Sequence, residues 1–512
     1  MTTPTTPTLQ NQSVLVLGLG ASGLAMARWC VRQGARETVS DTRSAPPQLA
    51  TLQAEHPGVA FVCAPPNAVL LTESGAQLVL KSPGLAPAQV ADIVAAAQAA
   101  GIRVSGELGL FAHALEHLRG TSAYQPIVLA VTGTNGKTTV TALTGQLVQR
   151  AGKSVAVAGN IGPTLLDTLA ARLDAATLPE VWVLELSSFQ LAGLDAVDSA
   201  IFQPSAACVL NLTQDHLDWH GSMLAYAQAK ARVFGAQTLM LLNRDDAQVL
   251  AMLPAPVKGR QTRPYVGFGA GMPQRPGDFG LEQVHGITWL VRALELDPTV
   301  KVRKGQQMDE LHLQRLMPAE ALRLRGRHNA VNALAALALA AAAGCALAPV
   351  LYGLREYRGE PHRVESIGVV QDVEYFDDSK GTNVGATVAA LGGLGVERKL
   401  VLILGGDGKG QDFSPLLAPV AQFARVVVLI GRDAALIRSA LGPSGVAMLD
   451  ARDMQHAVAL AAQQARVGDA VLLSPACASL DMFDNYLHRA RVFCEAVAAM
   501  AQEHGVVLEG AA

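Results

Sequence analysis

Short apolar runs recur along the chain, and most of them end in a loop that carries glycine and polar residues. In the first part, run 13–18 ends at a glycine and run 78–80 leads into the sequence KSPG at 81–84. Helix-like segments separate the runs. Apolar runs of this length are typical of buried parallel strands, and their alternation with helices predicts an α/β fold. In such sheets ligands bind beyond the carboxyl ends of the strands, so these loops are the candidate sites.

The same alternation continues through the middle of the chain. Strand-like runs lie at 127–131, 154–158, 181–186 and 207–210. A segment rich in Ala and Leu, 326–344, predicts a buried helix that begins near His328. There Asn329 and Asn332 share one helical face, although Asn329 could equally cap that helix. Residues 269–320 mix Gly and Pro turns with short alternating runs, which predicts a small β excursion.

The last part of the chain repeats the pattern once more. Apolar runs end near Phe376, Leu404, Ile430 and Leu473, and a polar loop with a lysine or a hydroxyl follows most of them. This arrangement predicts a second doubly wound sheet whose loops line one crevice. Any single lysine among them could also be an ordinary solvated turn residue.

Two polar, turn-rich stretches divide the chain. The stretches 116–126 and 357–361 interrupt the alternation, and 512 residues suffice for about three domains of ~150 residues. We therefore predict an α/β protein with three domains. These are an N-terminal Rossmann-like domain (1–120), a central P-loop ATPase-like α/β domain (121–359) and a C-terminal Rossmann-like doubly wound sheet (360–512).

The stretch AVTGTNGKTT at 130–139 carries the clearest chemistry. A strand leads into a glycine loop, and Lys137 and Thr138 open a helix-like segment. Exposed N–H groups at a helix start and a lysine attract phosphate, and a hydroxyl after the lysine suits Mg²⁺. The strict phosphate-loop spacing requires glycine where Val131 stands, so this is a variant loop. The alternative is a glycine turn that binds nothing.

A second glycine loop follows the first strand. Residues 18–23 read GLGASG, and Asp41 and Arg43 come after the next strand, which is expected to end near Val39. Glycines at a strand-to-helix turn with an acidic residue about 20 positions later have the Rossmann form. NAD is the usual inference, and another nucleotide diphosphate in the same crevice is equally compatible.

Polar groups also cluster beyond the central strands. The strand at 181–186 delivers Glu185 at its end, and the sequence DHLDWH at 215–220 is followed by a helix-like stretch, 222–234, with Lys230. Zinc would need three firm ligands, whereas Mg²⁺ needs few carboxylates beside phosphate oxygens. Beside a phosphate loop we favour Mg²⁺. Helix capping by Asp215 or Asp218 with surface histidines is the alternative.

Composition narrows the class of protein. A formal net charge of −3 argues against nucleic-acid binding, and six cysteines without a CxxC pair suggest scattered buried thiols in a reducing compartment. The polar start of the chain lacks the form of a signal peptide, and the Ala-rich runs are too short to span a bilayer. We expect a cytoplasmic protein without membrane insertion.

Seven motifs together resemble the Mur ligase family. They are GTNGKTT, ELSSFQL, DHLDWH with Lys230, RHNAVNALAA, DDSKGTN, GGDGKG and SPACASLD. The resemblance implies a three-domain ligase that uses ATP to join an amino acid to a UDP-linked muramyl precursor of peptidoglycan. GLGASGL with Asp41 to Arg43, DDSKGTN and SPACASLDMF are most similar to the D-glutamate-adding branch. Its substrates are UDP-N-acetylmuramoyl-L-alanine and D-glutamate, and we expect a monomer.

The resemblance also assigns residues to the substrates. Residues for the UDP precursor are Ala21, Ser22, Asp41, Arg43, Gly84, Asn160, Ser187 and Gln190. Residues for ATP are Gly133, Thr134, Asn135, Gly136, Lys137, Thr138, Thr139, Asn329, Asn332, Arg363 and Asp378. Residues for D-glutamate are Lys380, Thr382, Lys409, Ser479 and Tyr486, the last of which is often Phe in the family. Catalytic residues are Lys137, Glu185, His216 and Lys230. Residues for two Mg²⁺ ions are Thr138, Glu185, His216 and Lys230 as a carbamate.

Three other activities compete with this interpretation. Another amide ligase of the same type would share the phosphate loop, but a folate ligase would not need the N-terminal unit. An NAD-dependent oxidoreductase, read from the glycine turn, leaves the phosphate loop and DHLDWH unexplained. A non-catalytic nucleotide-binding regulator would not need Lys137, Glu185, His216 and Lys230 together. The ligase therefore explains most of the motifs.

Overall fold

The computed structural model describes residues 9–259, 261, 263–295, 311–324, 326–396, 398–506 and 508. The chain divides into two compact units. The first comprises the described residues up to Asn211 with Trp219–Phe268 and Ala335–Gly353. The second comprises Leu212–Asp218, Gly269–Leu334 and the chain from Leu354 onward.

The N-terminal sheet is parallel, with the order β3-β2-β1-β4-β5. Helices α3 and α4 pack on one face, against Leu15, Leu17 and Val79. This confirms the predicted α/β domain, although the second strand ends at Asp41 and not near Val39. The strands are β1 (Ser13–Leu17), β2 (Arg36–Asp41), β3 (Ala60–Cys63), β4 (Leu78–Lys81) and β5 (Arg103–Ser105). The helices are α1 (Ala21–Arg32), α2 (Leu49–Glu55), α3 (Ala68–Ser74), α4 (Pro87–Ala99) and α5 (Glu107–Ser122).

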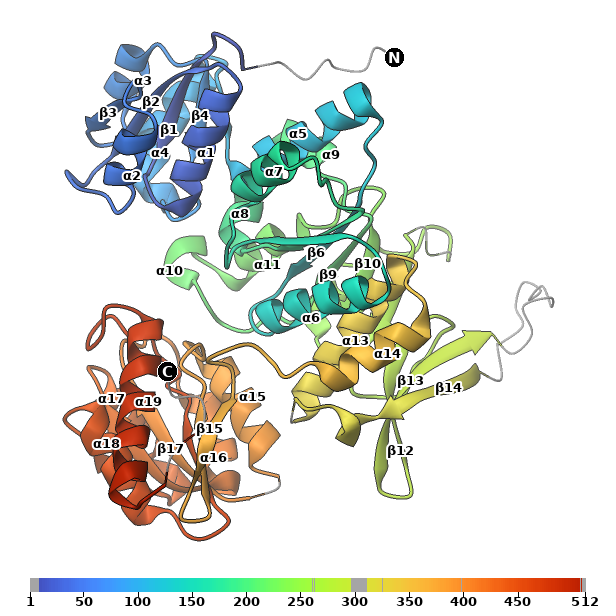
Figure 1. The fold of residues 1–512 in the computed structure, drawn as a ribbon, viewed down its shortest axis with the longest axis vertical. Helices are drawn as coiled ribbons and strands as arrows, with labels where there is room; N and C mark the ends of the chain where they lie inside the picture. The colour runs from blue at the N-terminus through green and yellow to red at the C-terminus, as the bar shows by residue number, and fades with distance from the viewer. Residues whose placement is uncertain are drawn as a thin grey trace. The chain divides into compact units, whose positions relative to one another are not determined.

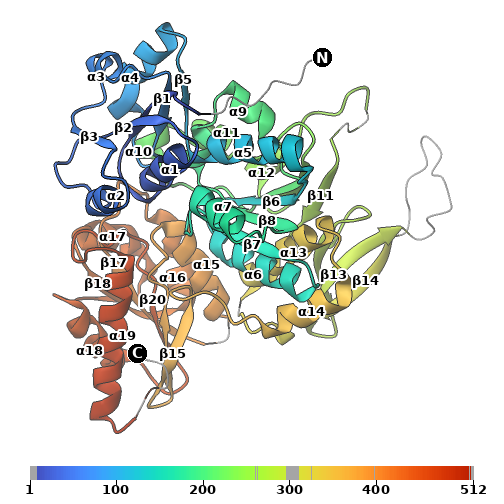
Figure 2. The same ribbon diagram turned by 45° about the horizontal axis from the view of Figure 1, so that its top comes forward.

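The central sheet is also parallel, with the order β11-β10-β9-β6-β8-β7, and α6 packs on β7 and β8 (Figures 1 and 2). Strand β6 lies between β8 and β9, so the loop that follows it is flanked by both strand ends. The strands are β6 (Ile127–Thr132), β7 (Val155–Gly159), β8 (Val181–Glu185), β9 (Ala206–Val209), β10 (Leu239–Asn243) and β11 (Tyr265–Phe268). The helices are α6 (Lys137–Arg150), α7 (Leu165–Asp174), α8 (Ser188–Ala192), α9 (Ala196–Ile201), α10 (Leu217–His220), α11 (Met223–Ala231) and α12 (Ala247–Leu250).

The predicted β excursion is confirmed as a three-stranded antiparallel sheet. It consists of β12 (Phe279–Val284), β13 (Ile287–Glu295) and β14 (Leu311–Pro318), and the part of the prediction on 296–310 lies outside the described residues. A short 3₁₀ turn (Ala319–Ala321) leads to α13 (Arg327–Ala342) and α14 (Leu347–Glu356). Helix α13 begins next to His328, as predicted, and its alanines and leucines are largely buried.

The C-terminal sheet is mixed, with the order β15-β16-β20-β17-β18-β19. Alternate residues of β17 point to opposite faces: Leu402 packs towards α15, α16 and α17, and Ile403 packs towards α18 and α19 (Figures 1 and 2). The strands are β15 (Glu365–Val370), β16 (Val373–Asp377), β17 (Leu400–Gly405), β18 (Ala424–Ile430), β19 (Ala447–Asp450) and β20 (Ala470–Leu473). The helices are α15 (Val384–Leu394), α16 (Leu417–Phe423), α17 (Ala434–Leu441), α18 (Met454–Gln464) and α19 (Tyr486–Glu503).

Three details differ from the sequence predictions. Strands β3, β5, β10, β11, β15 and β19 were not predicted, and all of them except β10 lie at sheet edges; β15 is antiparallel to β16. Residues 116–122 are the last turns of α5 and not a turn-rich linker, so the boundary at 120 stays a prediction. All cysteines are free, but Cys63 is exposed. In the described chain we find no helix that is both long and apolar enough to cross a membrane.

Close packing of α1 on β1 yields a stability prediction. A Cβ on Gly23 would lie 2.0 Å from Gly18 O, whereas a Cβ on Gly20 would meet nothing within 4 Å. Gly23→Ala should therefore lower the free energy of unfolding by about 1–3 kcal/mol, because the helix must move off the strand. Gly20→Ala is the matched control and should be close to neutral. Chemical denaturation of both variants checks this, and equal stability would contradict it.

Candidate active site

The loop between β6 and α6 has a backbone that requires glycine at two positions. Gly133 has φ +150° and Gly136 has φ +82°, and a Cβ on Gly133 would lie 2.9 Å from Leu210 Cβ. Gly136 is the N-cap of α6 and gives the helix no side-chain cap. The first N–H groups of α6 directly follow this loop, where the motif predicts that an anion binds.

Asn211, at the end of β9, holds this loop in place and was not predicted from the sequence. Its main-chain oxygen accepts a hydrogen bond from Thr134 N (2.9 Å), and its Oδ1 accepts one from Asn135 N (2.8 Å). Its Nδ2 donates to Asn135 O at 3.0 Å. The only sequence signal was its position directly after a strand that neighbours β6. Asn211 fixes the shape of the loop before any ligand binds.

Two lysines meet at this loop. Lys137 Nζ donates to Gly133 O and Thr134 O, both at 2.9 Å, and Lys230 Nζ donates to Gly133 O at 2.8 Å. Lys230 comes from α11, is 1% exposed, and lies over the Tyr226 ring with 4.6 Å between Nζ and the centroid. Since Tyr226 also contacts Thr134 Oγ1 at 3.1 Å, α11 is tied to the loop at two points. Lys230 is therefore a buried lysine and not a solvated one on the helix surface.

Glu185 brings a carboxylate to the same edge. It lies at the end of β8, in register with Val131 of β6 and Gly159 of β7, and is 1% exposed. Its Oε1 accepts a hydrogen bond from Asn160 Nδ2 at 3.0 Å. Its Oε2 is buried without a hydrogen-bond partner among the described residues. A buried, unsatisfied carboxylate oxygen next to a phosphate loop suits a hard cation such as Mg²⁺.

The DHLDWH segment divides between two roles. His220 is structural, because its Nε2 lies 2.9 Å from Ser188 Oγ and its ring stacks on Phe189. His216 has φ +54°, and its N–H donates to Asp215 Oδ1 at 3.0 Å. Within the described chain, this segment does not supply a cluster of three metal-ligating side chains, so zinc finds no support. His216 belongs to the second unit, and its role beside the phosphate loop stays a prediction.

Ser187 and Gln190 serve α8 directly. Ser187 is the N-cap of the helix, its Oγ accepts from Gln190 N, and Gln190 Oε1 accepts from Ser187 N at 2.9 Å. This reciprocal capping box uses the Ser187 hydroxyl and the Gln190 carbonyl. Only the amide nitrogen of Gln190 is left for the predicted contact with a precursor.

The N-terminal glycine turn is held by Asp41. Its Oδ2 accepts from Leu19 N (2.8 Å), and Arg43 binds both carboxylate oxygens at 2.9 and 2.8 Å. The hydrogen bonds from Arg43 and from backbone N–H groups hold the pKa of Asp41 well below its usual range. Both oxygens are thus engaged within the protein, which does not suit the ribose contact of an NAD enzyme. The Arg43 side chain is 54% exposed and faces solvent at this edge.

Helix α1 has no side-chain cap at its start, and the Ser22 hydroxyl interacts with Glu107. Ala21 and Ser22 are the first residues of α1, and the N-cap Gly20 has no side chain to cap it. The Ser22 side chain hydrogen-bonds Glu107, a buried carboxylate that also accepts from Leu166 N at 3.2 Å. Burial raises the pKa of Glu107. The contact of Ser22 with a diphosphate stays a prediction.

Three loops of the C-terminal domain lie side by side, because their strands β16, β20 and β17 are neighbours. The loop after β17, which carries Lys409, is bridged to the loop before Ser479 by two hydrogen bonds between Asp407 and Ala478. The Lys380 ammonium lies over the Tyr486 ring, 3.8 Å from its centroid. The loops that carry Lys380, Lys409 and Ser479 therefore follow neighbouring strands at one edge of the sheet, and the single crevice stays a prediction.

Asp378 sits beneath this edge. It accepts a hydrogen bond from Ser474 Oγ at 2.7 Å, and burial raises the pKa of Asp378 to about 7, although Ser474 and Arg363 oppose this. A Cβ on Gly381 would lie 2.5 Å from Asp378 Oδ2, so glycine is required where the loop turns. On α13, Asn332 Nδ2 donates to Asn329 Oδ1 at 3.1 Å, which confirms their shared face.

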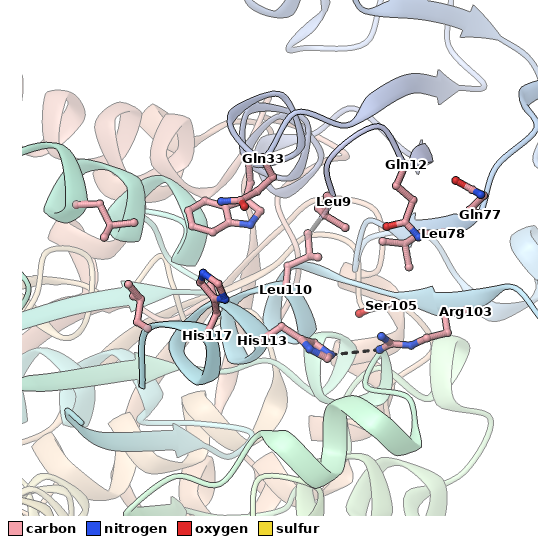
Figure 3. A pocket seen from close by; sticks show the side chains of 14 residues that line it. Leu9, Gln12, Gln33, Gln77, Leu78, Arg103, Ser105, Leu110, His113 and His117 are labelled. Atoms are coloured by element: carbon pink, nitrogen blue, oxygen red, sulfur yellow. Dashed lines mark hydrogen bonds between the residues drawn. The ribbon is translucent and has the colours of Figure 1, made fainter. Parts of the chain in front are cut away.

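A separate cavity of about 180 Å³ lies at the opposite edge of the N-terminal sheet (Figure 3). Gln12, Leu78 and Arg103, which line it, stand at the amino ends of β1, β4 and β5. Arg103 lies 3.3 Å from His113 Nε2 and donates to the buried Asp198 on α9 at 2.8 Å. Because the candidate residues follow the carboxyl ends of the strands, this cavity is not part of the candidate site.

Comparisons with known families cover most of the chain. Residues 12–106 match the profile of the Mur ligase MurD-like N-terminal domain, and residues 131–340 match that of the Mur ligase middle domain. Residues 362–477 match the Mur ligase glutamate ligase domain. The gaps between these matches lie near the two predicted domain boundaries.

Individual proteins are similar over almost the full length. The chain is 67% identical over 508 residues to the UDP-N-acetylmuramoylalanine–D-glutamate ligase of Albidiferax ferrireducens, covering 98% of this chain and 99% of that protein. It is 57% identical to the ligase of the same name from Burkholderia cenocepacia, over 97% and 98% of the two chains. Among solved structures, MurF from Acinetobacter baumannii has a TM-score of 0.56 at 18% identity, over 96% of this chain and 92% of that chain. UDP-N-acetylmuramate-alanine ligase MurC from Thermotoga maritima has a TM-score of 0.55 at 20% identity, over 95% and 99%. These two share the fold.

The hydrogen bonds between Asn211 and the phosphate loop yield a prediction. Asn211→Ala removes both side-chain hydrogen bonds to Asn135, so the loop loses its fixed shape and nucleotide affinity should fall about tenfold. Isothermal titration with a non-hydrolysable ATP analogue measures this. Asn243→Ala is the matched control, because Asn243 is a neighbouring amide that donates to Leu210 O at 2.8 Å and does not hold the loop. Equal affinity in both variants would contradict a specific role for Asn211.

Proposed function

The chain belongs to the Mur ligase family, and we propose that it joins D-glutamate to UDP-N-acetylmuramoyl-L-alanine in an ATP-dependent step of peptidoglycan synthesis. The observation that carries this function is the near-full-length identity to ligases of that specificity. The geometry supports it independently. A phosphate loop, a buried carboxylate and two lysines meet at one sheet edge, and a second sheet gathers lysines and hydroxyls.

The central domain positions the ATP phosphates. The N-terminus of α6 and Lys137 supply positive charge to oxygens that gather negative charge as the γ-phosphoryl group moves. When ATP binds, Lys137 exchanges the carbonyls of Gly133 and Thr134 for phosphate. The chain thus keeps its lysine aimed along the loop before the nucleotide arrives.

The same edge has donors for Mg²⁺, a group that the fold family implies. The orphaned Glu185 Oε2 fits a cation, and Thr138, His216 and Lys230 as a carbamate complete the proposed set of ligands for two ions. Bound Mg²⁺ supplies positive charge to the phosphate oxygens. Asn160 holds Glu185 through Oε1, which leaves Oε2 directed to the cation.

The reaction makes an amide from a carboxylate in two displacements. An oxygen of the L-alanine carboxylate attacks the γ-phosphorus of ATP, the bond to the β-phosphate oxygen breaks, and ADP leaves. The amine of D-glutamate then attacks the acyl carbon of the acyl phosphate, and inorganic phosphate leaves as the amine loses a proton. Phosphorylation is necessary because a free carboxylate is a poor electrophile.

Each outer domain would hold one of the joined substrates. Arg43, Gly84 and the N–H groups of Ala21 and Ser22 would bind the UDP diphosphate and uracil, with Asp41 holding Arg43 in place. Asn160 and Gln190 would touch the muramyl part. Lys380 and Lys409 would pair with the carboxylates of D-glutamate, with help from Thr382, Ser479 and Tyr486.

Phosphate release tests the proposed reaction. With ATP, Mg²⁺ and UDP-N-acetylmuramoyl-L-alanine, we expect phosphate release with D-glutamate, and not with L-glutamate or L-alanine. Mass spectrometry of the product should show the precursor plus one glutamyl residue. Release only with L-alanine, or with none of the three, would overturn the proposal.

A second test concerns Lys230, which we propose to be carbamylated. A buried ammonium beside Mg²⁺ would repel it, whereas carbamylation by CO₂ releases protons and leaves an anion. Lys230→Ala should lose activity and regain part of it with short carboxylic acids. Independently of activity, ¹³C NMR after incubation with ¹³C-bicarbonate should show a carbamate signal that Lys230→Ala lacks. A fully active alanine variant, or the same signal in both proteins, would refute the modification.

A further inference from the structure

The segment that follows the turn-rich stretch at 357–361 is bonded to the loop that carries Asp378 and Lys380. His362 Nδ1 donates to Asp377 Oδ2 at 2.7 Å, and Lys380 N donates to His362 O at 3.2 Å. Between them, Val364 N donates to the Asp378 carboxylate. Three residues of the loop are therefore held by two residues that the reaction scheme above does not use.

Asp377 is the centre of this contact. It is the last residue of β16 and is 0% exposed, and its Oδ1 accepts from Ser379 N (2.9 Å) and Ser379 Oγ (2.6 Å). Its Oδ2 accepts from His362. The carboxylate therefore shapes the loop with one oxygen and joins it to the incoming chain with the other.

The backbone of the incoming segment is strained. His362 has φ +63° and Val364 has φ +51°, and a β-branched residue rarely adopts this region. His362 N donates to Glu365 Oε2 at 2.8 Å, so His362 is fixed through its N–H, its carbonyl and its ring. Strain of this kind persists only where the surroundings enforce it, and such positions concentrate near functional sites.

Helix α19 closes the same loop from another side. Arg489 is 1% exposed, its Nη2 donates to Ser379 O at 2.7 Å, and its Nη1 donates to Cys477 O at 3.1 Å. One turn earlier on α19, Tyr486 carries Lys380 over its ring and meets the His362 ring edge-on at 6.3 Å. The loop is thus gripped between His362 and α19, with the Lys380 ammonium at the junction.

We propose that His362, paired with Asp377, is a positioning residue that orients the loop of Asp378, Lys380 and Thr382 for the incoming amino acid. The proposal rests on the proposed function, in which Lys380 and Thr382 receive D-glutamate. His362 does not touch the reacting atoms. It acts by fixing Asp377, and Asp377 fixes the turn that aims the Lys380 side chain.

A hydrogen-bonded pair explains this cluster better than a bound cation does. The ligand atoms of His362, Glu365 and Asp377 lie within 4.8 Å of one another, which would allow a metal. However, the 2.7 Å contact is a complete charge-assisted hydrogen bond, and both Asp377 oxygens already have donors. A metal would have to displace the donors that shape the loop.

The groups facing His362 favour its charged form. The hydrogen bond from His362 to Asp377 raises the pKa of His362, and Glu365 on β15 adds to this, while burial and Lys380 oppose it; Tyr486 faces it from α19. Since the pKa is raised, the charged pair is complete at low pH and weakens as pH rises through that pKa. Any contribution of the charge to positioning must fade over the same range.

Steady-state kinetics tests the role. His362→Ala should raise KM for D-glutamate about tenfold, because the loop loses a hydrogen bond between charged groups. KM for UDP-N-acetylmuramoyl-L-alanine should not change, since the first domain binds it. His362→Asn places an amide N–H near the position of Nδ1 and should recover most of this loss at high pH. The ratio of KM for D-glutamate in His362→Asn to that in wild type should fall towards one as pH rises.

A matched control separates positioning from general damage. His488→Ala removes a histidine of similar exposure that also pairs with an aspartate, the exposed Asp484, in the same domain. We expect wild-type KM values from it. In the substrate-free protein, amide hydrogen exchange of 378–382 should quicken in His362→Ala and not in His488→Ala.

The outcomes distinguish this inference from the proposed function. If wild type does not use D-glutamate while exchange of 378–382 still quickens in His362→Ala, the function fails and the positioning role stands. If wild type is active but His362→Ala keeps its KM for D-glutamate and its exchange rates, the inference is overturned. Equal rises in KM for both substrates would also overturn it, because they would indicate general destabilisation.

Discussion

The phosphate loop takes its form because Gly133 has no side chain. A Cβ there would lie 2.9 Å from Leu210 Cβ and would push the loop off the end of β9. With glycine, the loop lies against that strand end, Asn211 can bond two of its residues, and the Gly133 carbonyl becomes the meeting point of Lys137 and Lys230. The contacts of Asn211, Lys137 and Lys230 with the loop depend on this close approach of Gly133 to Leu210. Glu185 lies at the same sheet edge, at the end of β8.

Two lysines meet at one carbonyl of the central site. Lys137 and Lys230 both donate to Gly133 O, and the nearby Glu185 keeps one carboxylate oxygen unsatisfied. A triphosphate with its metal ions would satisfy both conditions, because phosphate oxygens attract the lysine and a cation satisfies the carboxylate. The unliganded site is therefore already organised for the groups that the reaction brings.

The sequence predicted those features that follow from local pattern. Apolar runs with glycine-bearing ends located the strands of three sheets and the loops at their carboxyl edges, because parallel strands are buried on both faces. It did not locate β3, β5, β10, β11, β15 and β19, most of which lie at sheet edges. Nor did it distinguish direct from indirect roles: Ser22, Ser187 and Asp41 were assigned to a precursor, yet their side chains bond Glu107, Gln190 and Arg43. Gln190 and Arg43 lie only three and two residues after Ser187 and Asp41, so these hydrogen bonds depend on the local helix cap and turn, whereas Glu107 is brought to Ser22 by tertiary structure.

The proposed D-glutamate site is also organised before a ligand binds, but here the organising groups are buried carboxylates. The loop after β16 begins with two adjacent buried carboxylates, Asp377 and Asp378, which would repel each other if neither had a partner. His362 and Ser379 satisfy the first, and burial keeps the pKa of the second near neutrality, at about 7. The buried Arg489 donates hydrogen bonds to main-chain carbonyls of two loops and not to these acids. Because different groups stabilise the two carboxylates, Asp377 can hold the shape of the loop while Asp378 can contact a ligand.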